Sequence, residues 1–184
     1  MFYAHEDEVK AAIRHLKNNQ SPGPDGIINE ILKAIMAFVT ETLLLPPCLV
    51  KYFNKLFSSG SYPVEWTKAI IVPFHKKSYI NDVDNYRGIS LLNVLNKVFT
   101  HIVNRSLTDW AESNTVISDA QTVFRTQHST MDHIFTLYTC VQKYMNRGDK
   151  FYVAYIDSSK AFDSVQHSLL WSSEQVSRVK CFEC

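Results

Sequence analysis

Apolar residues recur at helical spacing in five stretches of the chain. Residues 6–18 place four apolar side chains on one helical face, which predicts an amphipathic helix packed against a core. The same three-to-four-residue spacing continues beyond this stretch. The further predicted helices cover residues 27–45, 49–58, 91–113 and 130–146.

Local signals mark where several of these helices begin and end. Pro46 and Pro47 end the second helix, because proline cannot continue a helix and restrains its predecessor. Ser129 and Asp132 fit a capping box at the start of the last helix. Gly148 is a plausible C-terminal stop for the same helix.

Residues 21–26 read Ser-Pro-Gly-Pro-Asp-Gly and interrupt the helical pattern. Two prolines and two glycines in this stretch predict a tight, stiff turn that ends the first helix. Composition alone favours a linker here.

Two apolar stretches, 66–77 and 85–92, flank the polar loop 78–84 and predict a β-hairpin. Lys76 and Lys77 lie at the end of the first predicted strand, near the tip of the hairpin, and Arg87 lies on the second strand. Basic side chains in these positions could bind the phosphates of a nucleoside triphosphate. The commoner alternative for a pair of lysines is a solvated surface charge.

A third strand is predicted at Phe151–Ile156, an apolar and largely β-branched or aromatic run that ends abruptly on Asp157. A carboxylate at the end of a buried strand is costly unless it is hydrogen-bonded, charge-paired or bound to a cation. The plain alternative is a strand, a turn, and Asp163 near the start of a helix.

Charge is distributed unevenly along the 184 residues. The whole chain has a net charge of +1 and 46% hydrophobic residues, as in an ordinary globular protein. Residues 51–110, however, carry 8 basic and 4 acidic residues, a net charge of +4. This middle stretch is where a phosphate backbone would be attracted.

The cysteines and the apolar runs give no sign of a disulfide-rich, zinc-binding, secreted or membrane-spanning protein. The four cysteines are too scattered for a disulfide framework, and Cys181 and Cys184 form a CxxC without a second pair for a zinc site. Residues 1–20 are not typical of a signal peptide, and no apolar run approaches the ~20 residues that span a membrane. We therefore expect an intracellular protein with no membrane partner.

The stretch from Phe151 to Val165 resembles motif A of reverse transcriptases, in the form "VDxxKAFDxV" of LINE-like, non-LTR retrotransposons of the jockey type. This resemblance implies that Asp157 is a catalytic residue that binds magnesium. It also implies that Phe162 lies against the sugar of the incoming nucleotide and blocks a 2′-hydroxyl.

Upstream motifs resemble the same family and occur in its order. Residues 66–77 and the run Asn-Tyr-Arg-Gly-Ile-Ser-Leu-Leu from Asn85 resemble the polymerase fingers, which implies that Lys76 or Lys77 and Arg87 face the nucleotide phosphates. Residues 119–130 resemble "QxGFRxxxST", which implies a template contact by Gln121 and Arg125. Val123 stands where that motif usually has glycine. The turn at residues 21–26 resembles the segment that precedes the fingers.

The resemblance implies an α/β (α+β) fold: helix-rich reverse-transcriptase fingers with a β-hairpin, plus an incomplete palm sheet. Residues 1–60 would form an N-terminal helical extension, 61–148 the fingers, and 149–171 the start of the palm. Residues 172–184 do not match the family's motifs. No later aromatic-x-Asp-Asp strand tip occurs in the sequence.

The implied parent reaction is DNA synthesis on an RNA template from a DNA primer and deoxynucleotides. Two Mg²⁺ ions about 4 Å apart would activate the primer and neutralise the leaving pyrophosphate. Because one carboxylate motif is present, we expect this chain to be inactive alone. The alternatives are a non-catalytic nucleic-acid-binding remnant or a functionless product of a decayed element. An unpaired apolar edge at Phe151–Ile156 predicts self-association.

Overall fold

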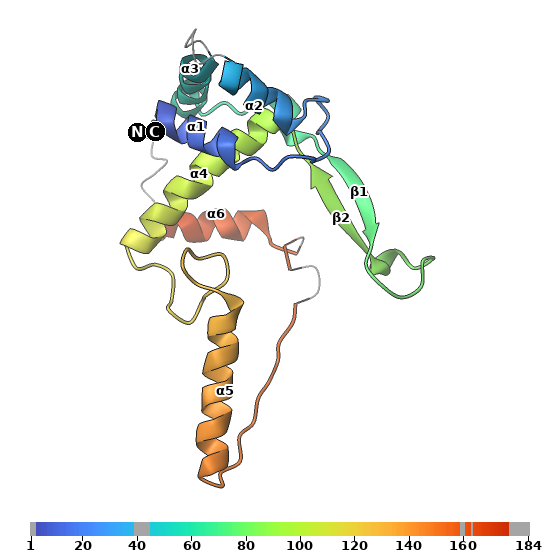
Figure 1. The fold of residues 1–184 in the computed structure, drawn as a ribbon, viewed down its shortest axis with the longest axis vertical. Helices are drawn as coiled ribbons and strands as arrows, with labels where there is room; N and C mark the ends of the chain where they lie inside the picture. Colours follow the sequence, from blue (N-terminus) through green and yellow to red (C-terminus); the bar gives the residue numbers. More distant parts are fainter. Residues whose placement is uncertain (1–2, 39–44, 159–160, 163, 177–184) are drawn as a thin grey trace. The chain divides into compact units, whose positions relative to one another are not determined.

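The computed structural model describes residues 3–38, 45–158, 161–162 and 164–176. Two compact units divide the chain, the first up to Asp109 and the second from Trp110 onward. Among the described residues, no helix is long and apolar enough to cross a membrane. In chain order the elements are α1 (Glu6–His15), α2 (Asn29–Phe38), α3 (Leu45–Ser59), η2 (Val64–Thr67), β1 (Ile70–His75), η3 (Val83–Asn85), β2 (Tyr86–Leu91), α4 (Val94–Ser113), α5 (Thr130–Asn146) and α6 (His167–Val176) (Figure 1).

The core of the first unit lies where α1, α3 and α4 meet. Val9, Phe53 and Val98, one from each helix, are fully buried there. An aromatic cluster extends the core, and its ring centroids lie 4.8 to 6.5 Å apart. Its members are Phe53, Phe57, Tyr62, Trp66 and Phe99.

Several helix boundaries differ from the sequence prediction, and helices α2 and α4 begin two and three residues late, at Asn29 and Val94. Helix α1 ends at His15, three residues early. Pro46 and Pro47 lie inside the first turn of α3, where a missing backbone N–H costs nothing because that donor has no partner within the helix. The two prolines therefore mark the start of α3, and residues between α2 and α3 lie outside the described ranges.

The turn at residues 21–26 is packed against the rest of the unit, so the linker interpretation is wrong. The Asp25 carboxylate accepts a hydrogen bond from the Val94 backbone N–H at 3.1 Å and so caps the start of α4. The Asn93 side-chain oxygen in turn accepts one from the Asp25 backbone N–H at 3.3 Å. Gly23 lies against the backbone of Leu92. A Cβ added at this position would be 2.3 Å from the Leu92 carbonyl carbon.

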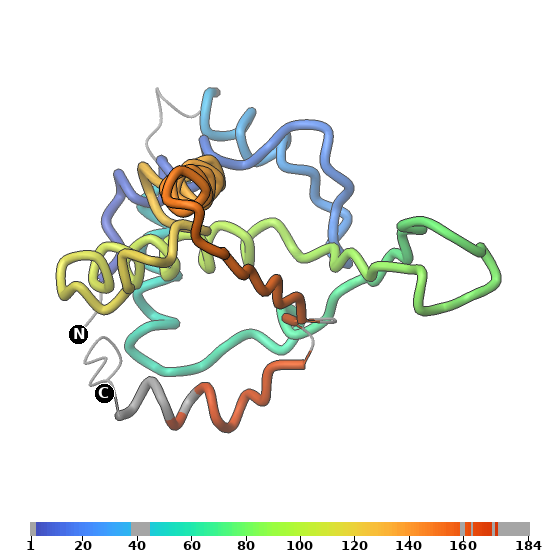
Figure 2. The backbone as a smooth tube through the Cα atoms, turned by 90° about the horizontal axis from the view of Figure 1, so that it is seen from below, coloured from blue at the N-terminus to red at the C-terminus, as the bar shows by residue number. Residues whose placement is uncertain are grey.

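Strands β1 and β2 form the predicted antiparallel hairpin, which extends away from helices α1, α2 and α3 (Figures 1 and 2). The first strand begins later than predicted, at Ile70, because Trp66 sits in the short helix η2. Buried amides hold η2 in place: Asn96 Nδ2 donates to the Trp66 carbonyl at 3.2 Å, and Asn93 Nδ2 donates to the Glu65 carbonyl at 3.2 Å.

In the second unit, α5 begins with the predicted capping box of Ser129 and Asp132. Gly148 follows its end with a φ of +75°, a left-handed conformation that favours glycine. The predicted strand Phe151–Ile156 does not form. These residues are irregular, and the Ile156 side chain is 93% exposed. A strand needs a hydrogen-bonding neighbour, and the described residues pair none with this run.

Candidate nucleotide and nucleic-acid site

The hairpin register brings two of the predicted phosphate ligands onto one face. Arg87 lies directly opposite Phe74, and the Lys76 backbone N–H donates to the Asn85 carbonyl at 2.9 Å. Side chains alternate along a strand, so Lys76, Phe74 and Arg87 share one face of the hairpin. Lys77 follows the strand and is also exposed.

These three cations are exposed and unneutralised. Within the residues that the structure describes, no carboxylate lies within 4 Å of the charged groups of Lys76, Lys77 or Arg87. Four exposed apolar side chains share this hairpin face: Phe74 lies opposite Arg87, and Ile70, Val72 and Ile89 lie nearer the helices. The face therefore combines apolar area with positive charge at its far end.

Asp157 belongs to the second unit and is exposed in the irregular segment that follows α5. No group of three or more His, Cys, Asp or Glu side chains able to hold a metal occurs among the described residues. Magnesium is usually held by one or two carboxylates together with substrate phosphates. Asp157 could supply one of these ligands, but the described residues do not form a complete metal site. Asp163 lies outside the described residues.

Phe162, the predicted sugar contact, has a ring that is 74% exposed and lies near the ring of Phe124. Their centroids are 6.3 Å apart with an interplanar angle of 73°, an edge-to-face arrangement. Phe124 has a φ of +64°, whereas Val123, at the position of the family's glycine, is not among the residues with positive φ. The left-handed turn thus falls one residue later than a glycine at 123 would suggest.

Arg125 has a set of partners that the sequence analysis did not anticipate. Its guanidinium donates to both carboxylate oxygens of Glu112, at 3.0 and 2.8 Å, and its side chain is only 9% exposed. It also donates to the backbone carbonyls of Ser118 and Gln121, at 3.0 and 3.3 Å. The hydrogen bonds from Arg125 lower the pKa of the Glu112 carboxyl.

These hydrogen bonds of Arg125 hold the loop between α4 and α5 in one conformation. Template contact by Arg125 and Gln121 stays a prediction. The structure shows Arg125 engaged with protein groups and Gln121 as an exposed side chain on the same loop. Glu112 lies 13 residues before Arg125. No local pattern could have revealed their pairing.

The sequence of this chain is similar to a known protein family and to several known proteins. A model described as reverse transcriptase (RNA-dependent DNA polymerase) matches residues 74–182, which include the end of β1, the whole of β2, Asp157 and most of the tail after residue 171. A probable RNA-directed DNA polymerase from transposon BS of Drosophila melanogaster is 29% identical over 167 residues, covering 90% of this chain and 18% of the relative.

Two further relatives have similar names. The RNA-directed DNA polymerase from the mobile element jockey of Drosophila melanogaster is 28% identical and covers 92% of this chain and 18% of the relative. The Pol polyprotein from the type-1 retrotransposable element R1 of Bradysia coprophila is 31% identical, covering 86% and 15%. This chain spans less than a fifth of the length of these relatives. The chain therefore belongs to the reverse transcriptase family and corresponds to part of the reverse transcriptase domain of non-LTR retrotransposons.

Proposed function

We propose that this chain supplies the nucleotide-binding fingers and the first catalytic carboxylate of an RNA-directed DNA polymerase acting inside the cell. Its substrates would be an RNA template, a DNA primer and deoxynucleotides. The family membership supports the reaction class, and the hairpin supports the role of this segment. The observation that carries the proposal is the hairpin register, which sets Arg87 opposite Phe74 and Lys76 beside Asn85, with no carboxylate of the described residues within 4 Å of either charged group.

A triphosphate concentrates negative charge over several oxygens, and its recognition needs several donors that converge from one side. Arg87 can present two parallel N–H donors to one phosphate, whereas Lys76 and Lys77 act as point charges on flexible stems. Phosphoryl transfer depends mainly on positioning and charge stabilisation. The hairpin face can provide the substrate positioning.

In the second unit, Asp157 would serve as the metal-binding carboxylate and Phe162 as the contact to the sugar. Bound magnesium ions would supply charge neutralisation and an activated primer hydroxyl. The described residues alone do not form a complete metal site. Phe162 can discriminate sugars by occupying space, and its contact with Phe124 limits where its ring can lie.

Replacing Lys76, Lys77 and Arg87 together by Ala is expected to weaken binding to single-stranded RNA and to flatten its salt dependence. Each phosphate contact contributes a slope of about 0.7 to the plot of log K against log salt, so the slope should fall by about 2. Fluorescence anisotropy across a salt series measures this slope. The matched control replaces Lys51, Lys55 and Lys68, three exposed lysines of the same unit.

The control variant has the same loss of charge but should keep more of the slope. Equal slopes for the parent and the hairpin variant would show that the hairpin cations do not contact phosphate. Equal losses in the two variants would show that RNA has no preference for the hairpin over other exposed lysines. Far-UV circular dichroism of each variant checks that the fold is intact.

We also propose that the chain self-associates through residues 151–156. Several apolar side chains of this run are exposed, led by Tyr152, Tyr155 and Ile156. An exposed apolar segment with free backbone groups recruits other chains, and lysine in such a segment discourages pairing. In sedimentation velocity the parent should form concentration-dependent oligomers, and Ile156→Lys should shift it toward monomer. Ile80→Lys, at another exposed apolar position, in the hairpin loop, should leave the oligomers unchanged. A parent that stays monomeric would refute the proposal.

A further inference from the structure

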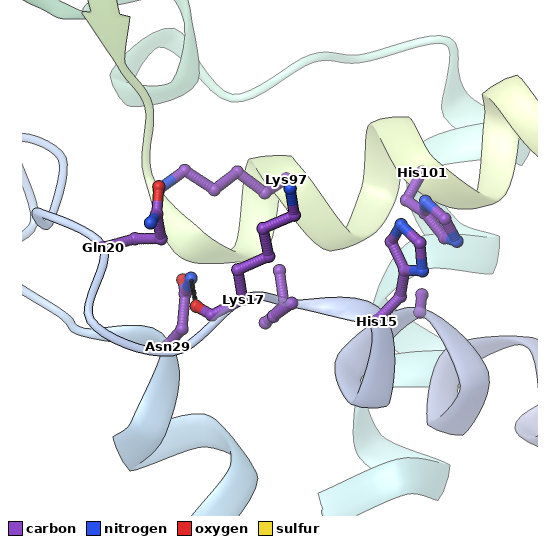
Figure 3. A pocket seen from close by; sticks show the side chains of 8 residues that line it. His15, Lys17, Gln20, Asn29, Lys97 and His101 are labelled. Atoms are coloured by element: carbon purple, nitrogen blue, oxygen red, sulfur yellow. Dashed lines mark hydrogen bonds between the residues drawn. The ribbon is translucent and has the colours of Figure 1, made fainter. Parts of the chain in front are cut away.

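A pocket of about 260 Å³ lies in the first unit between the C-terminal end of α1, the following loop, the start of α2 and the middle of α4 (Figure 3). Ala12 and Leu16 contribute apolar surface. The polar side chains that line it are those of His15, Lys17, Gln20, Asn29, Lys97 and His101.

None of the residues that line this pocket is acidic. Within the described part of the chain, no carboxylate lies within 4 Å of the ammonium group of Lys17 or Lys97. Glu30, which follows the pocket residue Asn29, accepts a hydrogen bond from the Asn19 backbone N–H. The pocket therefore carries two positive charges without a counter-charge on its walls.

The two histidines add further donors at one end of the pocket. The rings of His15 and His101 are stacked, with centroids 4.5 Å apart and an interplanar angle of 22°. Burial lowers the pKa of His101, and the nearby His15 and Arg105 lower it further. A bound anion would offset these repulsions and allow His101 to keep a proton.

The backbone around the pocket is held in place by a partly buried hydrogen bond and by the regular spacing of helix α4. The buried Asn29 donates through Nδ2 to the Lys17 carbonyl at 2.6 Å, which fixes the loop that carries Lys17 to the start of α2. Lys97 and His101 lie one helical turn apart on α4, so their side chains project on the same side. Donors thus reach the pocket from α1, the loop and α4 (Figure 3).

We propose that this pocket binds a phosphate group, either free or in the backbone of a nucleic-acid strand. Two ammonium groups and imidazole N–H donors around one space match a tetrahedral oxyanion, and the same positive charges repel a metal cation. The site is separate from the hairpin cations and does not rest on the proposed polymerase function.

Sulfate is the first probe, because it stays a dianion across the pH range in which histidine titrates. At constant ionic strength, sulfate should raise the thermal midpoint of the parent in a saturable way. The double variant Lys17→Gln with Lys97→Gln should bind sulfate roughly tenfold more weakly, because hydrogen bonds to charged groups contribute about 1.5 kcal/mol or more. Lys51→Gln with Lys55→Gln removes the same charge from exposed positions on α3 and should bind as the parent does.

The pH dependence tests the histidines. Sulfate should bind the parent more tightly at about pH 6 than at about pH 8, and His101→Gln should lose most of this difference. A pH dependence that survives in His101→Gln would place it on a group other than His101 and would contradict the proposed part of this histidine. His15→Gln, an exposed substitution, serves as a second variant if His101→Gln is unstable.

Competition then distinguishes the two sources of phosphate. If a strand is the ligand, a short single-stranded RNA displaces sulfate and an analogue with an uncharged backbone does not. If the ligand is free phosphate, inorganic phosphate competes and the RNA does not. Identical responses of the parent and the Lys17/Lys97 variant to sulfate, phosphate and RNA would overturn the proposal. The hairpin triple variant should keep its sulfate binding, so failure of one site leaves the other testable.

Discussion

Replacing Gly23 by Ala is expected to lower the free energy of unfolding of the first unit by about 3 kcal/mol, near the upper end of the usual cost of overpacking. The added Cβ would lie 2.3 Å from the Leu92 carbonyl carbon, 2.4 Å from its oxygen and 2.6 Å from the Asn93 nitrogen. All three are backbone atoms at the entrance to α4, so no side-chain rotation can relieve the overlap. The turn must move away, and the Asp25 cap on Val94 would be lost with it.

Urea unfolding followed by the fluorescence of Trp66 measures this effect, in a background that carries Trp110→Phe and Trp171→Phe. Gly26→Ala is the matched control within the same turn. Gly26 has a φ of +68° but nothing within 4 Å of an added Cβ, so only the backbone preference is lost, about 1 kcal/mol. A Gly23→Ala variant no less stable than Gly26→Ala would show that the turn does not pack against Leu92 and Asn93.

The isolated 184-residue chain is expected to show no detectable primer extension with an RNA template, deoxynucleotides and magnesium or manganese. Asp157 is the one carboxylate that the family motifs assign to the metal, and the sequence contains no later aromatic-x-Asp-Asp strand tip. Loss of a single electrostatic donor at a reacting centre already costs roughly a hundredfold in rate. Without further carboxylates, the charge that develops on the leaving pyrophosphate stays uncompensated.

A primer-extension gel with the parent and Asp157→Ala makes the comparison. Extension by the parent that disappears in Asp157→Ala would show that the remaining ligands come from a second chain. Binding of primer and template without extension fits a fingers segment and also fits a non-catalytic remnant. The hairpin triple variant separates these two, because loss of deoxynucleotide binding as well as RNA binding supports the fingers assignment.

Elements whose signals are local could be predicted from the sequence. The capping box of Ser129 and Asp132 and the stop at Gly148 depend on residues within one helical turn, so α5 was predicted almost to its ends. The hairpin was predicted for the same reason, since its loop and both strands are contiguous. The structure adds the strand register, which places Arg87 opposite Phe74, whereas the phosphate-facing role of Lys76 and Arg87 stays a prediction.

Features that depend on distant partners could not be predicted. The turn at residues 21–26 has the composition of a linker, and only its contacts with Leu92–Val94 show that it is part of the core framework. The run Phe151–Ile156 has strong strand propensity but no neighbouring strand among the described residues, and propensity without pairing does not make a sheet. The pairing of Arg125 with Glu112 and the pocket around His101 likewise join residues far apart in the chain.

The burial of Val98 against Val9 and Phe53 has a consequence for dissecting this protein. The family match begins at residue 74, yet α1 and α3, which cover the apolar face of α4, precede it. A truncation at residue 74 would strip α4 of its packing partners and leave the Val94 N–H without the Asp25 cap. Helices α1, α3 and α4 therefore depend on one another for their packing, and the Asp25 cap on α4 joins residues 69 apart in the chain. Contacts this far apart in the chain form slowly, so the cap that joins the turn at residues 21–26 to α4 is expected to form late in folding.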